Sequence, residues 1–402
     1  MRAYAKWALG AVAVGVAILG YLFATGERGL FGEPPPSRSL EIQRLGDEAA
    51  GRLGWSAEGL DAVFAFAATL SADSLMIVTD GETVAAFGDL SRKYHVHSIR
   101  KAFLSAIVGQ HLGDGDGRIP LAATLRDLNI DDTPQPLTAL QRTATVEHLL
   151  KSVSGINHKA AAESGLTSEK DRLLGEGENT PGEKWAYNNW DYNALTTIFE
   201  SRVRQSIAEA FRIGVARPTA MQDFSPDDVS YQQETKLSQH RAAAFRMSAR
   251  DLAKFGQLYL DGGRAGGAQV IPRAWTERVT KDYTQTGRDD LRWAHGYLWW
   301  LPGPGTALPE GSFWAWGLGN QAVMVIPAWD TVIVHQSDTT AFLQLFQSAI
   351  ERGAEPEDAL LELILSCKRR PNRETEYCME SRFTSRAEFA ELIDLIAGAR
   401  TR

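Results

Sequence analysis

Two pairs of β-rich segments, one towards each end of the chain, constrain the fold more than any other feature of the sequence. Ser74–Asp89 (SLMIVTDGETVAAFGD) contains a central Asp-Gly, and Gln321–Asp338 (QAVMVIPAWDTVIVHQSD) contains a central Pro-Ala-Trp-Asp. Apolar, β-branched runs on both sides of such turns are typical of β-hairpins. The residues between the two pairs are rich in loops and helical patterns. We therefore predict an α+β fold, an antiparallel sheet flanked by helices, with an α-helical insertion at about 115–235.

Three segments carry a helical pattern. Residues 98–108 place apolar side chains at positions 99, 102, 103, 106 and 107, and Ser248–Gly263 (SARDLAKFGQLYLDGG) is amphipathic and ends in two glycines. Residues 385–399, near the C-terminus, are also helical in pattern. Apolar residues three and four apart lie on one helix face, so each segment is predicted to be a helix.

The N-terminal residues 1–28 differ in composition from the rest of the chain. Arg2 and Lys6 precede twenty uncharged residues, Trp7–Gly26. At about 1.5 Å per residue, a helix of this length covers the ~30 Å hydrocarbon core of a bilayer. We expect a transmembrane anchor with its N-terminus in the cytoplasm, because positive charges precede the span. A secretory signal cleaved near Ala24–Gly26 is the alternative.

A proline-rich stretch, Gly32–Ser39, predicts an extended linker over residues 29–45 ahead of a folded domain over 46–402. In a bacterium this arrangement means an inner-membrane protein with its folded domain in the periplasm, or a secreted domain if the segment is cleaved. Cys367 and Cys378 are the only cysteines. In an exported protein they are expected to form a disulfide, with two free thiols as the alternative.

The charge balance argues against a nucleic-acid partner. The chain has 42 Lys and Arg against 50 Asp and Glu, a net charge of -8, whereas nucleic-acid binding favours a basic face. Gly113–Arg118 (GDGDGR) begins like a calcium loop, but the third acidic residue, the following glycine and the closing glutamate are missing. We expect a turn there, and no metal or organic cofactor. The sequence does not define the oligomeric state.

Ser98 and Lys101 form a Ser-x-x-Lys at the start of the helix predicted over 98–108. Residues three apart lie on one helix face, so the amine can reach the hydroxyl. The helix N-terminus favours negative charge on a group attached to Ser98. The lysine can act as a base only if burial or a nearby cation lowers its pKa. The alternative interpretation is a serine cap and a solvated lysine.

A second element, Tyr187-Asn188-Asn189, lies within Pro181–Leu195 (PGEKWAYNNWDYNAL). A tyrosine beside a serine and a lysine can relay a proton when the lysine cation stabilises its phenolate. The side chain of Asn189 can donate a hydrogen bond to a substrate carbonyl.

With these elements in this order, the chain resembles the serine β-lactamase-like hydrolases: class C β-lactamases, D-alanyl-D-alanine peptidases and family VIII esterases. It looks most similar to the nylon-oligomer (6-aminohexanoate-dimer) hydrolases. The resemblance runs from about Leu53 to Ser348. It rests on seven segments in order: HSIRKAFLSAIVG, TVEHLLKSVSGI, PGEKWAYNNWDYNAL, MSARDLAKFGQLYLDGG, VIPRAW, GYLWW and FWAWGLGNQAVMVIPAWDTVIV.

The resemblance implies a β-lactamase/transpeptidase-like fold and an acyl-enzyme mechanism. Ser98 is then the nucleophile, with Lys101 and Tyr187 as its proton-transfer partners and Asn189 as a substrate-binding residue. The substrate would be a small ester or amide.

The third family element is altered. Lys-Thr-Gly or His-x-Gly is replaced by Ala315-Trp316-Gly317, followed by Leu318. The resemblance implies that the Leu318 N–H completes an oxyanion hole with the Ser98 N–H, next to Gly317. Alanine cannot hold a substrate carboxylate as the family cation does, so penicillin hydrolysis is disfavoured while ester and amide hydrolysis remain. The nylon-oligomer hydrolases likewise have Ala-x-Gly there.

No Gly-x-Ser-x-Gly occurs, so an α/β-hydrolase with a Ser-His-Asp triad is not expected. The histidines nearest the nucleophile, His95 and His97, are interpreted mainly as packing or rim residues, and His295 and His335 as structural.

Several tryptophans fall in or beside the quoted segments, and they either line the substrate groove or fill the core: Trp190, Trp299, Trp300, Trp314 and Trp316.

Two other functions stay open at this stage. One is a cell-wall D-alanyl peptidase or a β-lactamase. The other is a non-catalytic binding or regulatory module on the same scaffold.

Overall fold

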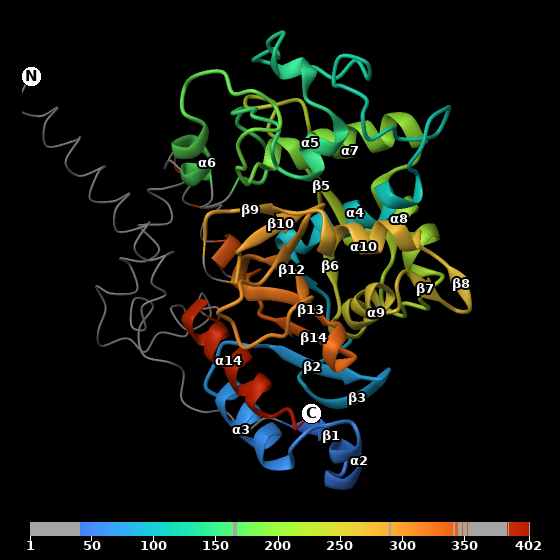
Figure 1. Cartoon of the computed structure of the whole chain (residues 1–402), viewed down its shortest axis with the longest axis vertical. Coiled ribbons are helices and arrows are strands. Elements are labelled where there is room, and N and C mark those ends of the chain that lie inside the picture. Colours follow the sequence, from blue (N-terminus) through green and yellow to red (C-terminus); the bar gives the residue numbers. More distant parts are fainter. Residues whose placement is uncertain are drawn as a thin grey trace, which may run out of the picture.

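A nine-stranded antiparallel sheet organises the computed structural model (Figure 1). The structure describes residues 41–163, 167–288, 291–340, 342–344, 348, 352, 384 and 386–401. In spatial order the strands are β1 (Ile42–Arg44), β3 (Glu82–Phe87), β2 (Ser74–Thr79), β14 (Thr331–Gln336), β13 (Gln321–Ile326), β12 (Phe313–Gly317), β11 (Trp299–Leu301), β10 (Ala294–Gly296) and β9 (Thr284–Gln285).

The two predicted hairpins are confirmed, and they pair with each other at the centre of the sheet. β2 pairs with β3 and β13 with β14, while β14 also pairs with β2 so that Ile333 lies opposite Ile77. Every residue of β2, β13 and β14 is buried. Such strands are covered on both faces, which explains their nearly continuous apolar sequences.

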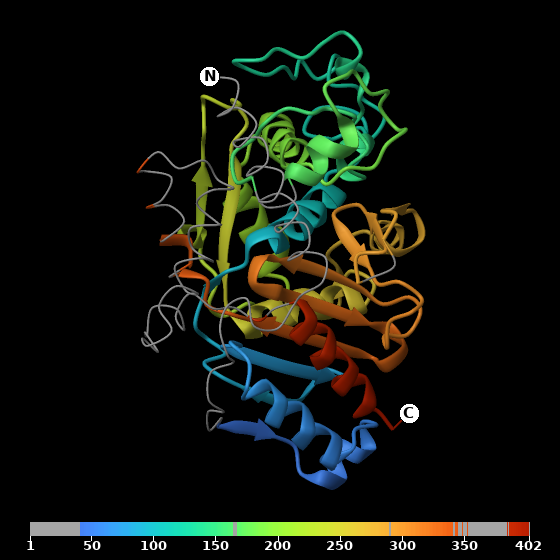
Figure 2. The ribbon, with the colours of Figure 1, turned by 90° about the vertical axis from the view of Figure 1, so that its left-hand side faces the viewer.

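Helices cover both faces of these central strands. α9 (Ala249–Leu260) packs on the face that presents Val332, and α14 (Arg386–Gly398) packs on the face that presents His335, whose ring lies 5.1 Å from that of Phe389. Residues 332 and 335 are an odd number apart, so they point to opposite faces of β14. Figure 2 shows α14 lying beside α3 (Ala57–Ala67). The predicted helices at 248–263 and 385–399 are therefore confirmed.

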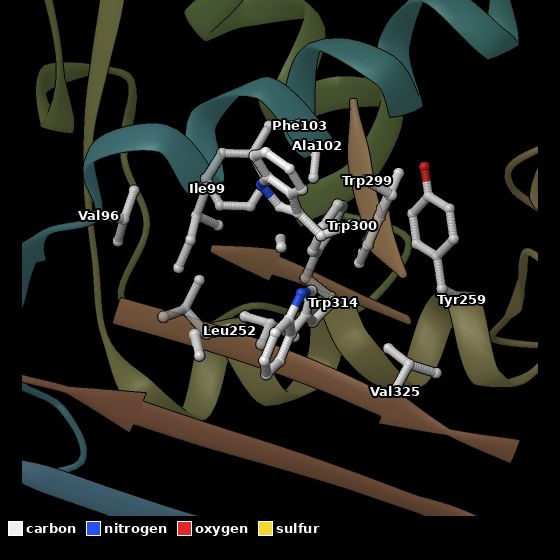
Figure 3. Close-up of a cluster of buried hydrophobic side chains, with 14 of the residues drawn as sticks. Val96, Ile99, Ala102, Phe103, Leu252, Tyr259, Trp299, Trp300, Trp314 and Val325 are labelled. Atoms are coloured by element: carbon white, nitrogen blue, oxygen red, sulfur yellow. The ribbon is translucent and has the colours of Figure 1, made fainter. Parts of the chain in front are cut away.

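The helix predicted over 98–108 is α4 (Arg100–Gln110), preceded by the short 3₁₀ helix η1 (His97–Ile99). Every residue from Arg100 to Gly109 is buried, so the helix is covered on all sides rather than on one face. Its Phe103 ring lies 4.8–5.0 Å from three other phenylalanines: Phe211, Phe245 and Phe255. Figure 3 shows apolar side chains from α4, α9 and the sheet gathered in this core.

The remaining elements surround α4. A small sheet is formed by β4 (Tyr94–His95), β6 (Ala242–Met247) and β5 (Val229–Gln232). The helical region contains η2 (Gln141–Thr143), α5 (Val146–Leu150), α6 (Thr167–Leu174), α7 (Asn189–Val203), α8 (Ile207–Phe211), the π-helical turn η3 (Arg212–Ala216) and η4 (Pro226–Asp228). Figure 1 shows α5, α6 and α7 at one end of the molecule and α8 nearer its middle, and all of these helices fall within the residues of the predicted insertion.

Smaller elements complete the described fold: α2 (Asp47–Arg52), the hairpin β7 (Arg264–Ala265) and β8 (Ala268–Gln269), α10 (Arg273–Lys281), η5 (Leu318–Asn320) and η6 (Pro327–Trp329). Gly113–Arg118 forms a turn, as predicted, with Asp116 3.9 Å from Arg204. Together these observations confirm the α+β fold with an antiparallel sheet and helices on its faces.

Several predictions from the ends of the chain fall on residues that the structure does not describe. The predicted membrane span Trp7–Gly26 and the predicted disulfide between Cys367 and Cys378 lie outside the described residues. The described part of the chain contains no helix with the length and apolarity needed to cross a bilayer. The predicted linker is too long at its end, because Ile42–Arg44 form β1 and pair with β3.

Gly256 allows α9 to approach the sheet closely. A Cβ at this position would lie 2.4 Å from Val332 Cγ1 and 2.9 Å from Val323 Cγ1. We expect Gly256→Ala to lower the free energy of unfolding by about 1–3 kcal/mol, the usual range for overpacking a core. Gly51→Ala in α2 is the matched control, since no atom lies within 4 Å of its Cβ position. It should gain up to about 1 kcal/mol from helix propensity. Urea denaturation of both variants measures the difference, and equal effects would refute this account of α9 packing.

Candidate active site

Ser98 and Lys101 meet as the sequence predicts. Ser98 lies in η1, directly before α4, and Lys101 lies in the first turn of α4. The Lys101 Nζ atom is 2.7 Å from Ser98 Oγ. The alternative of a solvated lysine is wrong, because only 3% of Lys101 is exposed.

Tyr187 reaches the same amine from a different part of the chain. Its Oη atom lies 2.5 Å from Lys101 Nζ. Tyr187 precedes α7, whose N-cap is Asn188; the Asn188 side chain accepts a hydrogen bond from Trp190 N at 3.1 Å. This cap fixes where the helix begins and therefore where the phenol projects. The hydroxyl, amine and phenol are thus in mutual contact within a buried site.

The surroundings of Lys101 and Tyr187 shift the pKa values of these two groups in opposite directions. Burial, together with the neighbouring Arg100 cation, holds the pKa of Lys101 well below its ordinary value, while Glu163 acts in the opposite direction. Burial raises the pKa of Tyr187 to about 12, although a hydrogen bond with Ser98 and the charges of Arg100 and Arg292 oppose this. A neutral lysine can accept a proton, and a protonated phenol can donate one.

Gly317 brings the end of strand β12 against the nucleophile. A Cβ on this residue would lie 2.4 Å from Val96 O and 3.2 Å from Ser98 N, so no side chain fits between the strand and η1. Leu318 follows at the start of η5. The backbone N–H groups of Ser98 and Leu318 therefore belong to adjacent segments, the arrangement expected of an oxyanion hole.

Asn189 lies near this site, with its side chain oriented by the backbone. Its Nδ2 donates to Ala162 O at 2.9 Å. Its Oδ1 atom is buried, and it has no hydrogen-bond partner among the described residues. A carbonyl group opposite Nδ2 fixes this orientation of the amide. The amide nitrogen carries two hydrogens and Ala162 O accepts only one, so the second can still donate to a substrate carbonyl, and the donor role stays a prediction.

Three residues lie around Tyr187: sequence reasoning named Trp300 as a candidate for the substrate groove, interpreted His295 as structural and did not single out Arg292. The Trp300 ring stacks on Tyr187, with centroids 5.5 Å apart and planes 20° apart. The His295 ring lies 4.7 Å from Trp300 and 6.1 Å from Tyr187, so this histidine lines the site rather than being remote from it. Burial and the Lys101 charge lower the pKa of His295 to about 3. The Arg292 guanidinium is 5.5 Å from the Trp316 ring. Trp300 lies in a quoted segment, but neither His295 nor Arg292 gives a local signal.

The other predicted histidines have structural contacts. His97 Nε2 lies 2.7 Å from Thr339 Oγ1, and His335 Nδ1 donates to Asn320 O at 2.8 Å. The ring of His95 lies 6.3 Å from that of His97, and burial is the main reason why the pKa of His95 is lowered. These contacts fit the predicted packing roles.

Some of the tryptophans named in the sequence analysis lie in the core, and others lie beside the candidate site. Trp190, Trp299 and Trp314 are almost completely buried, whereas Trp300 stacks on Tyr187 and Trp316 is partly exposed beside Gly317. Within the described ranges, no group of three or more His, Cys, Asp or Glu side chains could hold a metal ion.

The chain is similar in sequence to a known protein family and to one curated protein. The family model described as Beta-lactamase matches residues 61–355. An uncharacterized protein of Alkalihalophilus pseudofirmus is 23% identical over 263 residues, which cover 60% of this chain and 72% of that protein.

Among solved structures, a penicillin-binding protein homologue from Caulobacter crescentus is 15% identical, with a TM-score of 0.53 over 74% of this chain and 94% of that one. A proposed 6-aminohexanoate-dimer hydrolase from Bacillus anthracis is 20% identical, with a TM-score of 0.49 over 75% and 81% of the two chains. At these identities the comparison with the Caulobacter structure bears on the fold alone.

The opposed effects of Arg100 and Glu163 on Lys101 predict opposite shifts in the pH dependence of activity. The base must be neutral, so kcat/KM rises with pH through the pKa of Lys101. Glu163→Gln removes an anion that favours the protonated amine, and the acid limb should move to lower pH. Arg100→Gln removes a cation, and the limb should move to higher pH. The profile of kcat/KM for a p-nitrophenyl ester checks both directions. Shifts in the same direction would show that Lys101 is not the titrating group.

Proposed function

Because the chain belongs to the beta-lactamase family, we propose that it is a serine hydrolase that cleaves an ester or an amide through an acyl-enzyme on Ser98. The observation that carries this proposal is the contact of one buried amine, Lys101 Nζ, with both Ser98 Oγ and Tyr187 Oη. The same contact argues against a non-catalytic module, since a buried lysine with a lowered pKa has a large desolvation cost, and Lys101 forms no ion pair within the part of the chain that the structure describes.

In the acylation step, neutral Lys101 takes the Ser98 proton while Oγ forms a bond to the substrate carbonyl carbon. The electron pair of the C=O bond moves onto the oxygen, and the Ser98 and Leu318 N–H groups donate to that oxyanion. Backbone donors of this kind are independent of the side chain, so leucine at position 318 is compatible with the reaction.

Collapse of the tetrahedral intermediate expels the alcohol or amine. Tyr187, protonated in the free enzyme, donates its proton to this leaving group and recovers one from the Lys101 ammonium. Water then attacks the acyl-enzyme, with Lys101 and Tyr187 accepting its proton and returning one to Ser98 Oγ. The acid product leaves, and the enzyme regains its starting protonation state.

Two features of the site bear on the substrate. Trp316 is partly exposed beside Gly317 and offers aromatic surface to an apolar group of an ester or amide. The Nδ2 atom of Asn189 has a second hydrogen beyond the one donated to Ala162 O, which supports the proposed contact with a substrate carbonyl.

A second candidate, a peptidase or β-lactamase acting on a carboxylate-bearing substrate, is favoured by one observation. The Arg292 guanidinium lies over Trp316 and its charge acts on Tyr187, so a cation is present close to the strand that lacks the family lysine. Rapid acylation of Ser98 by a fluorescent penicillin would support this candidate over the esterase or amidase.

For the N-terminal residues we propose an uncleaved anchor that leaves the catalytic domain outside the cytoplasm, in the periplasm of a bacterium. The apolar Trp7–Gly26 and the preceding Arg2 and Lys6 support it. Fractionation of cells producing the full chain tests the anchor, with a chain starting at residue 29 as the comparison. Recovery of the full chain from the soluble periplasmic fraction, shortened at its N-terminus, would indicate a cleaved signal instead.

Replacement of the nucleophile gives the sharpest test of the proposed function. Ser98→Ala should lower turnover of a p-nitrophenyl ester at least about 10³-fold and abolish labelling by a fluorophosphonate probe. Ser105→Ala removes another buried hydroxyl from the same helix and should keep both activities. Turnover by Ser98→Ala at the wild-type rate would rule out the assignment.

A further inference from the structure

The two backbone donors of the predicted oxyanion hole are each bordered by a non-glycine residue in the left-handed conformation. His97, directly before Ser98, has φ 49°, and Asn320, two residues after Leu318, has φ 54°. This conformation is costly for residues with a side chain and persists only where the surroundings impose it. Other residues in this conformation lie in exposed hairpin turns, such as Asp80 and Asp330, or at buried positions, such as Tyr297 and Leu298.

Asn320 is held at both ends of its side chain. Its Oδ1 atom accepts from Trp316 Nε1 at 2.9 Å, and its Nδ2 donates to Thr384 O at 2.6 Å. Its backbone oxygen accepts from His335 Nδ1 at 2.8 Å. The turn that carries Leu318 is thereby tied to the strand before it, to strand β14, and to the residue ahead of α14.

His97 is held in a similar way on the other side of the oxyanion hole. Its Nε2 atom lies 2.7 Å from the hydroxyl oxygen of Thr339, three residues beyond β14. Its Cβ lies 3.2 Å from where a Gly317 Cβ would be, so the ring is also packed against the end of β12. The peptide bond that carries the Ser98 N–H joins His97 to Ser98. The side-chain hydrogen bond of His97 therefore fixes one of the two residues that orient this N–H group.

Both arms end near the same buried polar residues. The Asn320 arm reaches Thr384, whose Oγ1 atom lies 3.4 Å from Ser337 Oγ and 3.4 Å from His335 Nε2. The His97 arm reaches Thr339, which follows Ser337 by two residues along the backbone. We call four residues, each at most 2% exposed, the polar anchor: His335, Ser337, Thr339 and Thr384. Hydrogen bonds join three of them and the backbone joins the fourth, so both donors are fastened to one buried part of the fold.

We propose that Asn320 and His97 are positioning residues that hold the Leu318 and Ser98 N–H groups at a fixed separation by fastening them to the polar anchor. This inference rests on the proposed function, since it assigns a role within the acylation step. The donors must lie about 2.7–3.1 Å from the oxygen of the tetrahedral intermediate. A displacement of about 1 Å is enough to slow a reaction about 10²-fold.

The expected defect is confined to the transition state. The oxygen becomes fully anionic only as the tetrahedral intermediate forms, so a misplaced donor slows acylation while substrate binding stays the same. A purely structural role would instead lower stability and leave the acylation rate of the folded protein unchanged. These two outcomes can be measured separately.

The test compares two substitutions at opposite ends of strand β13. Asn320→Gly keeps the left-handed backbone without strain but removes the bonds to Trp316 and Thr384. Asp330→Gly makes the same backbone change at the exposed turn after β13, far from the nucleophile, and serves as the control. Burst kinetics with a p-nitrophenyl ester give the acylation rate constant and the dissociation constant, and urea denaturation gives the stability of each variant.

We expect Asn320→Gly to lower the acylation rate constant about 10- to 100-fold, with a dissociation constant within about twofold of wild type. Asp330→Gly should acylate at the wild-type rate. Thr339→Val, which removes the partner of His97, should also slow acylation, because the second donor is then released.

Two results would overturn the inference, and they differ from a failure of the proposed function. If wild type acylates and folded Asn320→Gly acylates equally fast, or loses activity only through weaker binding, the positioning role is wrong. If wild type neither acylates nor reacts with a fluorophosphonate, the hydrolase assignment fails and this role fails with it.

Discussion

The structure depends on a lysine amine that has been removed from water. Lys101 Nζ is enclosed by Ser98, Tyr187 and the ring of Tyr192, whose centroid is 4.8 Å away, and Arg100 lies next to it in sequence. Burial and the Arg100 cation both disfavour a protonated lysine at this position, and they hold the pKa of Lys101 well below its ordinary value. The same environment keeps Tyr187 protonated. In the proposed mechanism, burial thus suits Lys101 to the role of base and Tyr187 to the role of acid.

Several parts of the fold together exclude water from the Lys101 amine. The amine lies on α4, which is buried on all sides, and its cover comes from the helical region, from α9 and from the sheet. Those parts meet because β14, late in the sequence, pairs with β2, from the first hairpin. The pairing also places the end of β12 against η1, where only glycine fits at position 317. The sheet therefore positions the proposed oxyanion donor of Leu318, the helical region positions the phenol of Tyr187, and α4 contacts both parts of the fold.

Local sequence patterns predicted the parts of the structure that have local causes. The hairpins, the helices at 98–108 and 248–263, and the Ser98–Lys101 contact each follow from spacing within one short segment. The positions of Tyr187 and Gly317 followed from a resemblance across the chain. His295 and Arg292 were not predicted, because what places them beside Tyr187 and Trp316 is strand pairing at the sheet edge, which leaves no periodic signal. The orientation of the Asn189 amide depends on its hydrogen bond to the Ala162 carbonyl, a loop contact that the sequence does not reveal.

The altered third element illustrates how a site can lose a residue and keep its chemistry. A lysine at position 315 would contribute a positive charge near the phenol and a partner for a substrate anion. The first contribution is electrostatic and acts over distance, so Arg100 and Arg292, whose charges both lower the pKa of Tyr187, can supply it from other positions. The second needs direct contact, and alanine removes it from the strand. The oxyanion donors are backbone groups and do not depend on either contribution. In the proposed hydrolase, absence of the lysine therefore affects substrate recognition, while the groups proposed to form the acyl-enzyme are all present.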